Sequence, residues 1–185
     1  MVIDPQSGLL DAARYVPSPN CDERPVAQAM DLLVIHNISL PPNEFGGPYI
    51  EQLFTNCLNP EEHAYFQGIC HLQVASHLLI RRNGEIIQFV PFHKRAWHAG
   101  ESCYRDRQGC NDFSIGIELE GADDIPYEDV QYEKLIAVTQ ALFQTYNEMN
   151  ERRIVGHCDI APGRKTDPGQ AFDWKRYRSG LSKRV

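Results

Sequence analysis

The order of apolar and polar residues along the chain predicts several strands. Residues 31–38 form a nearly continuous apolar run, which is typical of a central strand buried on both faces. Residues 113–121 alternate strictly between two faces, as in a strand. Their apolar face carries Phe113, Ile115, Ile117 and Leu119, and their polar face carries Ser114, Gly116, Glu118 and Glu120. A short apolar run at residues 154–155 predicts one more strand.

A hairpin is predicted where Asn83-Gly84 separates two apolar segments, residues 76–82 and 85–90. An Asn-Gly pair between two such segments favours a two-residue turn and antiparallel strands. The stretch that follows, residues 101–112, is polar and is expected to be irregular.

Two short helices are expected after the first strand. Pro48 stands near the first turn of one, which would present Ile50, Leu53 and Phe54 on a single face. The other is expected to begin with Asn59 as its N-cap and Pro60 at its first helical position.

Helical spacing of apolar residues predicts a long helix over residues 127–149 and a last helix over residues 171–181. Residues 9–15 are expected to form one or two helical turns within an ordered N-terminal arm, residues 1–30. Strands that alternate with helices, together with one hairpin, predict an α/β protein with a single central mixed β-sheet and helices packed on both sides.

The chain of 185 residues is short enough to form one domain, residues 1–185. Its formal net charge of −7 disfavours nucleic acid and anionic lipid as partners. No basic run exceeds two residues, and the pair Lys183-Arg184 is terminal and expected to be frayed. No stretch reaches the roughly 20 apolar residues of a membrane span. The first residues lack a basic segment and a long apolar core, so they are not expected to act as a secretion signal.

The six cysteines are scattered and none forms a Cys-x-x-Cys pair. A disulfide scaffold is not expected at this length, so the thiols are interpreted as reduced, which favours a cytoplasmic protein.

Chemistry-bearing side chains gather in the turn-rich segment 156–169, which the Gly and Pro content predicts to be a loop of fixed shape rather than a helix. This segment holds His157, Lys165 and Asp167, and His36 ends the first long strand. Residues at strand exits converge on one edge of an α/β sheet. Two histidines and a carboxylate form a catalytic zinc set that leaves a fourth position for water. The alternative is that Asp167 caps the helix that follows or holds Arg164.

Other candidates each have a plain alternative. Glu118 could face a ligand near Gly116 and Gly121, or could be a solvated carboxylate at a sheet edge. Lys165 could point at a developing oxyanion or be a surface lysine. Trp97 and His98, on a loop bounded by Gly100, could form a stacking wall for a sugar ring, or Trp97 could belong to the core. Cys158 follows His157 on what would be extended backbone, so the two would face opposite ways, and Cys158 is interpreted as a small packing residue.

Five segments together carry a resemblance to a known family: residues 34–39 (VIHNIS), 75–80 (ASHLLI), 95–100 (RAWHAG), 111–118 (NDFSIGIE) and 156–169 (GHCDIAPGRKTDPG). In this order they resemble the zinc-dependent N-acetylmuramoyl-L-alanine amidases, and among these the AmpD type, a cytosolic 1,6-anhydro-N-acetylmuramyl-L-alanine amidase. The resemblance covers essentially the whole chain.

The resemblance implies a zinc ion held by His36, His157 and Asp167, with Glu118 as general base and Lys165 as oxyanion stabiliser. It implies a soluble anhydro-muramyl peptide as substrate, which is cut between the lactyl carbonyl and L-alanine during peptidoglycan recycling in the cytoplasm.

Asn37 and Trp97 are expected near the sugar and the scissile amide. Arg107 is expected to contact the peptide carboxylates, with Arg105 and Arg164 as further candidates. Gln73 stands where the family would suggest a basic residue.

Three other functions remain open from the sequence. A peptidoglycan-binding module would share the fold without turnover, a cysteine peptidase would use Cys158 or Cys110, and a regulatory protein would only sense muropeptides. A monomer is expected, although the sequence does not establish the oligomeric state. It also does not establish the preferred peptide length, activity on intact polymer or motion of residues 39–75.

Overall fold

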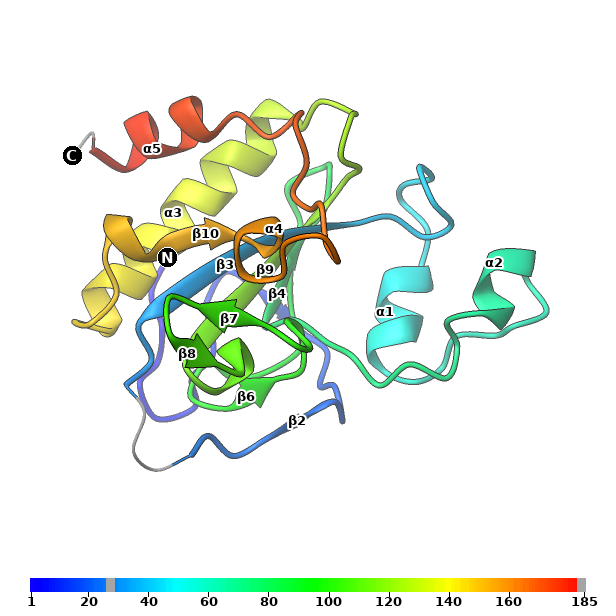
Figure 1. Ribbon diagram of the computed structural model, residues 1–185, viewed down its shortest axis with the longest axis horizontal. Helices are drawn as coiled ribbons and strands as arrows, with labels where there is room; N and C mark the ends of the chain where they lie inside the picture. The colour runs from blue at the N-terminus through cyan, green and yellow to red at the C-terminus, as the bar shows by residue number, and fades with distance from the viewer. Residues whose placement is uncertain (26–28, 183–185) are drawn as a thin grey trace.

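A six-stranded mixed sheet forms the centre of the computed structural model, which describes residues 1–25 and 29–182 (Figure 1). Its strands lie in the order β1 (Arg14–Tyr15), β5 (Ile86–Gln88), β4 (Leu78–Ile80), β9 (Ser114–Glu120), β3 (Leu32–Ile38) and β10 (Ile154–Gly156). All neighbouring strands are parallel except β4 and β5. The predicted mixed sheet is therefore confirmed, and β3 is an interior strand whose first five residues are buried.

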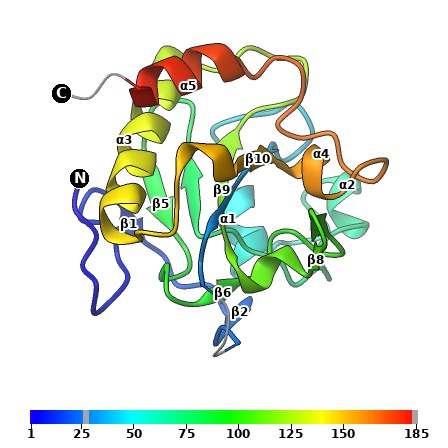
Figure 2. The same ribbon diagram turned by 60° about the vertical axis from the view of Figure 1, so that its left-hand side comes forward.

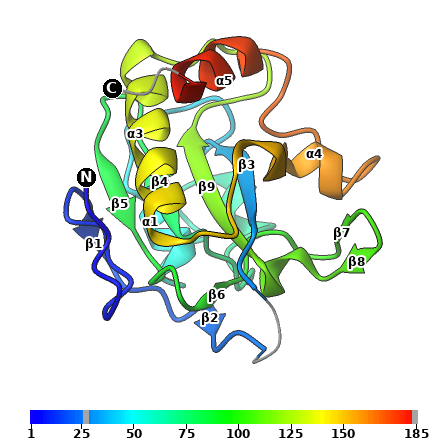
Figure 3. The ribbon, with the colours of Figure 1, turned by 90° about the vertical axis from the view of Figure 1, so that its left-hand side faces the viewer.

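Two helices, α3 (Asp129–Thr145) and α5 (Trp174–Ser182), cover one face of this sheet (Figure 3). The apolar face of β9 packs under them with Leu33 and Ile35 of β3, which confirms the predicted alternation for Ile115, Ile117 and Leu119. Phe113 departs from it and packs in a different cluster, because it precedes the strand at the end of a short 3-10 helix, η1 (Cys110–Asp112).

The helix α1 (Tyr49–Phe54) covers the opposite face (Figure 2). Its predicted apolar face is confirmed: Ile50, Leu53 and Phe54 are buried in one cluster with Leu79 and Ile87 of the sheet. Helices thus lie on both sides of the sheet, as expected.

The second short helix, α2 (Ala64–Gln67), starts later than predicted. Its N-cap is His63, whose Nδ1 accepts from the Tyr65 backbone N–H at 3.1 Å. Asn59 instead accepts from the Glu61 N–H at 3.0 Å, which makes a separate turn. The predicted cap was therefore wrong, because the same Asn side chain can close an isolated turn as readily as start a helix.

The hairpin at Asn83-Gly84 is confirmed: β4 and β5 pair antiparallel, and Gly84 has a φ of 84° that favours glycine. The long helix α3 is shorter than the predicted 127–149. It starts after Glu128, whose N–H donates to the Gln131 side chain, and it ends where Tyr146 becomes extended.

The N-terminal arm contains no helical turn at residues 9–15, so that prediction was wrong. Arg14–Tyr15 instead pairs with β5, because Leu10 and Ile3 are drawn into the buried cluster under α3. Further along, β2 (Cys21–Asp22) pairs with β6 (Arg95–Ala96). Residues 26–28 of the predicted arm and Lys183-Arg184 lie outside the described residues. The assignment of the whole chain to one domain stays a prediction.

Two segments expected to be irregular contain regular structure. The 101–112 segment forms a small hairpin from β7 (Cys103–Tyr104) and β8 (Arg107–Gln108), followed by η1. The 156–169 segment, predicted as a loop, opens with the helical turn α4 (His157–Ile160). A 3-10 turn, η2 (Glu151–Arg153), precedes β10. None of the helices among the described residues is long and apolar enough to cross a bilayer.

Candidate metal centre and active site

The sheet register brings three candidate residues to one place. His36 of β3 lies directly beside Glu118 of β9, because these strands are parallel and in register along their length. Gly156 of β10 pairs with Ile35, so His157 leaves the next strand beside His36. The Cys158 N–H donates to the Asp167 carbonyl oxygen at 3.0 Å, which folds the loop back and returns Asp167 to the same point.

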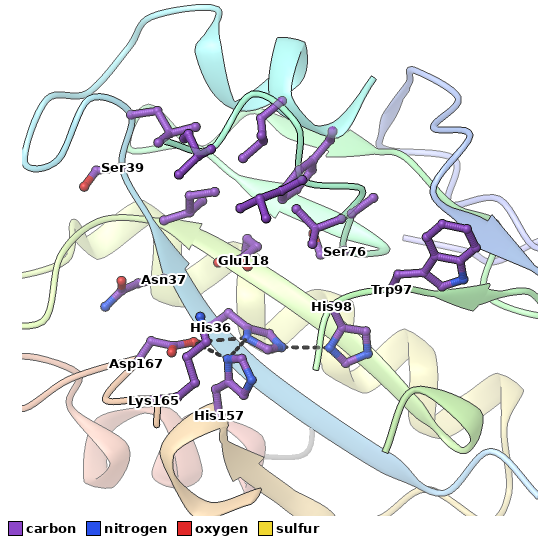
Figure 4. Close-up of a pocket in the computed structure, with 18 of the residues that line it drawn as sticks. His36, Asn37, Ser39, Ser76, Trp97, His98, Glu118, His157, Lys165 and Asp167 are labelled. Carbon is purple, nitrogen blue, oxygen red and sulfur yellow. Dashed lines mark hydrogen bonds and ion pairs between the residues drawn. The ribbon is translucent and has the colours of Figure 1, made fainter. Parts of the chain in front are cut away.

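His36, His157 and Asp167 converge on one point (Figure 4). The His36 Nδ1 is 3.0 Å from both the His157 Nδ1 and the Asp167 Oδ2, and the last two atoms are 3.1 Å apart. Ligand atoms that share a tetrahedral zinc lie roughly 3.3 Å apart, since each is about 2.0–2.1 Å from the ion. The donor set therefore fits a small cation.

The protonation states suit metal binding. Burial lowers the pKa of His36 to about 4, so its imidazole is neutral at pH 7, as a metal ligand must be. Burial raises the pKa of Asp167, but its contacts with His157 and His36 outweigh this and hold the pKa well below its usual range. The site thus presents the neutral imidazole of His36 and the ionised carboxylate of Asp167 beside the His157 ring.

Glu118 lies at the wall of the cavity with only 9% of its surface exposed. Its Oε2 has no hydrogen-bond partner among the described residues. Burial, reinforced by the Asp167 charge, raises its pKa well above the usual value. A buried carboxyl group with a raised pKa and a free oxygen is suited to act as a general base and acid. The alternative of a solvated edge carboxylate does not hold.

Lys165 lines the same cavity, and Figure 4 shows its side chain beside His36 and Asp167. Its position follows from α4, since the Lys165 N–H donates to the Ala161 carbonyl oxygen at 3.0 Å. Within the described part of the chain, its ammonium group has no ion-pair partner.

The cavity has a volume of about 360 Å³ and two chemically different ends. The polar end contains the residues described above. The other is apolar and is lined mainly by the α1–α2 region, with Leu40, Leu53, Phe54, Tyr65, Ile69 and Leu72. Such a cavity suits a ligand with both apolar and polar parts.

Asn37 and Trp97, the two residues expected to contact substrate, both line this cavity. The Asn37 side-chain N–H donates to Asp123 Oδ1 at 2.8 Å, which orients the amide and leaves its oxygen for another partner. Trp97 is half-buried at one end of the cavity (Figure 4).

The candidate arginines lie elsewhere. Arg107 donates to both carboxylate oxygens of Asp31, at 3.0 and 2.8 Å, and its guanidinium stacks 3.6 Å from the centre of the Phe113 ring. It does not line the cavity. Arg164 donates to the Ala99 carbonyl oxygen at 2.8 Å and borders a neighbouring polar cavity with Asp123. Arg105 lies at the β7–β8 turn.

The space above Gly116 is not left for a ligand, contrary to expectation. A Cβ atom there would lie 2.5 Å from His98 Cγ, so the glycine makes room for the His98 ring. Gly121 similarly accommodates the Tyr127 ring. From the sequence, His98 was expected only as part of a possible sugar-stacking wall with Trp97, although the combination of a strand glycine and a histidine in the preceding loop was a possible signal for its contact with the sheet.

The cysteines do not support a thiol mechanism. Burial raises the pKa of both Cys158 and Cys110, which keeps the thiols protonated at neutral pH. Cys158 lies on the helical turn α4, so the expectation of extended backbone at this position was wrong. Neither thiol lines the cavity.

Comparison with known proteins agrees with this geometry. A family model described as N-acetylmuramoyl-L-alanine amidase matches residues 26–170. The chain therefore belongs to the N-acetylmuramoyl-L-alanine amidase family, whose resemblance was noted from the five sequence segments.

Within this family the chain is similar to the AmpD branch. It is 58% identical over 178 residues to the 1,6-anhydro-N-acetylmuramyl-L-alanine amidase AmpD of Escherichia coli, covering 96% of this chain and 97% of that protein. A crystal structure of a selenomethionine AmpD derivative superposes with a TM-score of 0.94 at 57% identity, covering 98% and 100% of the two chains.

A more distant neighbour shows a ligand. The amidase AmiD from E. coli, in complex with the substrate anhydro-N-acetylmuramic acid-L-Ala-D-γ-Glu-L-Lys, has a TM-score of 0.59 at 29% identity, covering 85% of this chain and 60% of that one.

Proposed function

We propose that this protein is a zinc amidase that hydrolyses the amide between the lactyl group of (1,6-anhydro-)N-acetylmuramic acid and L-alanine in muropeptides. The observation that carries the proposal is the convergence of His36, His157 and Asp167 beside the unpaired carboxylate of Glu118. The names of the AmpD relatives, and the muropeptide bound to AmiD, support the choice of bond and substrate.

Zinc is the cation that best suits two imidazoles and one carboxylate with a remaining open position. When bound, it supplies a Lewis acid next to the cavity and lowers the pKa of a coordinated water to about 7. The ligand atoms of His36, His157 and Asp167 would hold it.

Glu118 and Lys165 would perform the acid–base and electrostatic work. Glu118 accepts a proton from the attacking water and returns it to the nitrogen of the leaving L-alanine, which departs as an amine. Burial raises the pKa of Glu118, which makes its carboxylate a stronger proton acceptor than an exposed glutamate. The Lys165 ammonium, without a partner among the described residues, would stabilise the negative charge on the carbonyl oxygen. No covalent enzyme intermediate is required.

Asn37 and Trp97 are proposed to contact the sugar and the scissile amide, since both line the cavity beside the metal centre. Arg107 is a weaker candidate for the peptide carboxylates, because its charge is already paired with Asp31. Arg164, at the border of the neighbouring polar cavity, is better placed for that role.

We also propose that the enzyme works in the cytoplasm, as a monomer, in peptidoglycan recycling. All six cysteines are free in the structure, which suits a reducing compartment. The net charge of −7 argues against a nucleic-acid partner. Light scattering of the purified protein would test the monomer.

The decisive experiment is peptide release from purified anhydro-muramyl tripeptide, measured with the native protein, after chelation, and after zinc is restored. Loss and recovery of activity is expected. Activity that persists after chelation, with metal removal verified by elemental analysis, would refute the zinc mechanism. A folded, zinc-loaded protein without turnover would instead support a binding function.

A further inference from the structure

The imidazole of His98 connects a candidate metal ligand to the sheet. His36 Nε2, the ring nitrogen that faces away from the metal position, lies 2.9 Å from His98 Nδ1. On the far side of the same ring, His98 Nε2 lies 3.0 Å from the Ser114 hydroxyl. The three side chains form a continuous chain that starts at the metal centre, in which His36 and Ser114 are buried and His98 is partly buried.

The metal position fixes the direction of every hydrogen bond in this chain. If His36 Nδ1 gives its lone pair to a cation, the proton of His36 is on Nε2 and is donated to His98 Nδ1. His98 must then carry its own proton on Nε2 and donate it to the Ser114 oxygen. Each ring therefore has one tautomer that satisfies both of its nitrogens.

His157, the other candidate ligand histidine, contacts Ala99, the residue that follows His98 in the same loop. His157 Nε2 lies 3.1 Å from the Ala99 carbonyl oxygen, which also accepts from Arg164. A single side chain, Asn111, fixes this loop: its Oδ1 accepts from the backbone N–H groups of both His98 and Ala99, at 3.1 and 2.8 Å. His98 and Ala99, which are consecutive, thus contact the ring nitrogens of His36 and His157 that face away from the metal position.

The surroundings of His98 leave its ring little freedom. It is packed over Gly116, where any side chain would collide with it. It also lies edge-on to His36, with ring centres 5.0 Å apart. A ring held this tightly can fix the rotation of its neighbour, as well as its tautomer.

We propose that His98, backed by Ser114 and by the Asn111-held loop, is a positioning residue that sets the tautomer and orientation of His36 for metal binding. The proposal rests on the proposed metal centre. It assigns His98 no contact with substrate and no proton transfer during turnover.

The test is zinc affinity, measured by competition with a chromophoric chelator, for wild type and four variants. His98→Phe keeps a ring of similar size but removes the acceptor. His98→Asn places an amide oxygen near the former Nδ1 position and so restores a hydrogen-bond acceptor for His36 Nε2. Ser114→Ala removes only the hydrogen bond between His98 Nε2 and the Ser114 hydroxyl. His77→Phe is the control, because His77 is a fully buried histidine beside His98 with no hydrogen bond to a metal ligand.

His98→Phe is expected to weaken zinc binding by about 10–100-fold, the usual effect of losing the partner of a ligand histidine. His98→Asn should recover most of this loss, and Ser114→Ala should lose only a few-fold. His77→Phe should lower the thermal midpoint without changing zinc affinity. The visible spectrum of the cobalt-substituted protein should change for His98→Phe and remain unchanged for His77→Phe.

Folding of each variant is checked by the thermal midpoint without metal. A folded His98→Phe that binds zinc like wild type would overturn the proposal. Equal losses of affinity in His98→Phe, His98→Asn and His77→Phe would also overturn it, by indicating general packing damage. A wild type that binds no zinc would refute the proposed metal centre and this inference together, whereas a normal wild type with an insensitive His98 refutes the inference alone.

Discussion

Replacing Glu118 with glutamine separates the chemistry of this carboxyl group from its place in the fold. Gln has nearly the same shape but neither accepts a proton at neutral pH nor carries a charge. Glu118 is buried, and its Oε2 has no partner among the described residues, so the exchange breaks no recorded hydrogen bond at that atom. The variant is therefore expected to fold and to keep the three ligand atoms in place.

The expected loss of turnover is about 10²- to 10⁴-fold, the usual contribution of a general base. This corresponds to roughly 2.8–5.6 kcal/mol of transition-state stabilisation, at about 1.4 kcal/mol per factor of ten. Zinc content should stay at that of wild type, because Glu118 is not one of the three convergent ligands.

While turnover falls, the free energy of unfolding of the metal-free protein should rise in the Glu118→Gln variant. Burial raises the pKa of Glu118 in the folded protein above the ordinary value of 4.5. Below that value both the folded and unfolded states are protonated, and the group contributes nothing. As the pH rises, the unfolded chain releases its proton while the folded protein holds it or buries a charge, so the free energy of unfolding falls. Glu118→Gln removes this loss of stability, because glutamine does not ionise.

The assay pairs peptide release with urea unfolding of the metal-free wild type and variant between pH 4 and pH 8. The variant should gain stability relative to wild type as the pH rises, by about 1.4 kcal/mol for each unit of pKa shift, until the folded-state pKa is passed. Retained turnover would refute the role as general base. Loss of zinc would make Glu118 a ligand, and a stability difference that does not vary with pH would refute the raised pKa.

Three further substitutions test other parts of the site. Gly116→Ala should lower the free energy of unfolding by about 1–3 kcal/mol and weaken zinc binding, because the Cβ of the alanine would collide with His98. Unchanged zinc affinity in calorimetry would contradict this prediction. Arg107→Ala should lower the free energy of unfolding by only about 0.5–1.5 kcal/mol, because Asp31 loses one charged partner but keeps Arg153. KM should stay the same, and a selective rise in KM would support Arg107 as a substrate contact. Trp97→Ala should raise KM several-fold with zinc content unchanged, since one aromatic contact contributes about 0.5–1.5 kcal/mol beyond its buried area. Steady-state kinetics would measure this change, and an unchanged KM would argue against contact between Trp97 and the substrate.

Periodic segments of this sequence predicted their structure well. The alternation over residues 113–121 and the apolar run over residues 31–38 both became strands, because burial of one or two faces demands those patterns. Asn83-Gly84 marked the hairpin for an equally local reason. Short elements were predicted poorly: residues 9–15 form no helix, and α4 occurs where a loop was expected. Segments this short follow their tertiary contacts rather than their intrinsic preference.

The chain itself determined which residues could form a metal centre, since its apolar runs predict strands that end near His36 and His157, and Asp167 lies on the loop that follows. The tertiary structure decided what each of them contacts. Register between β3 and β9 set His36 beside Glu118, and folding of the 96–100 loop over Gly116 set His98 behind His36. The same packing paired Arg107 with Asp31, 76 residues away in sequence. These contacts join distant segments, and their geometry depends on the whole sheet, so no local pattern of residues encodes them.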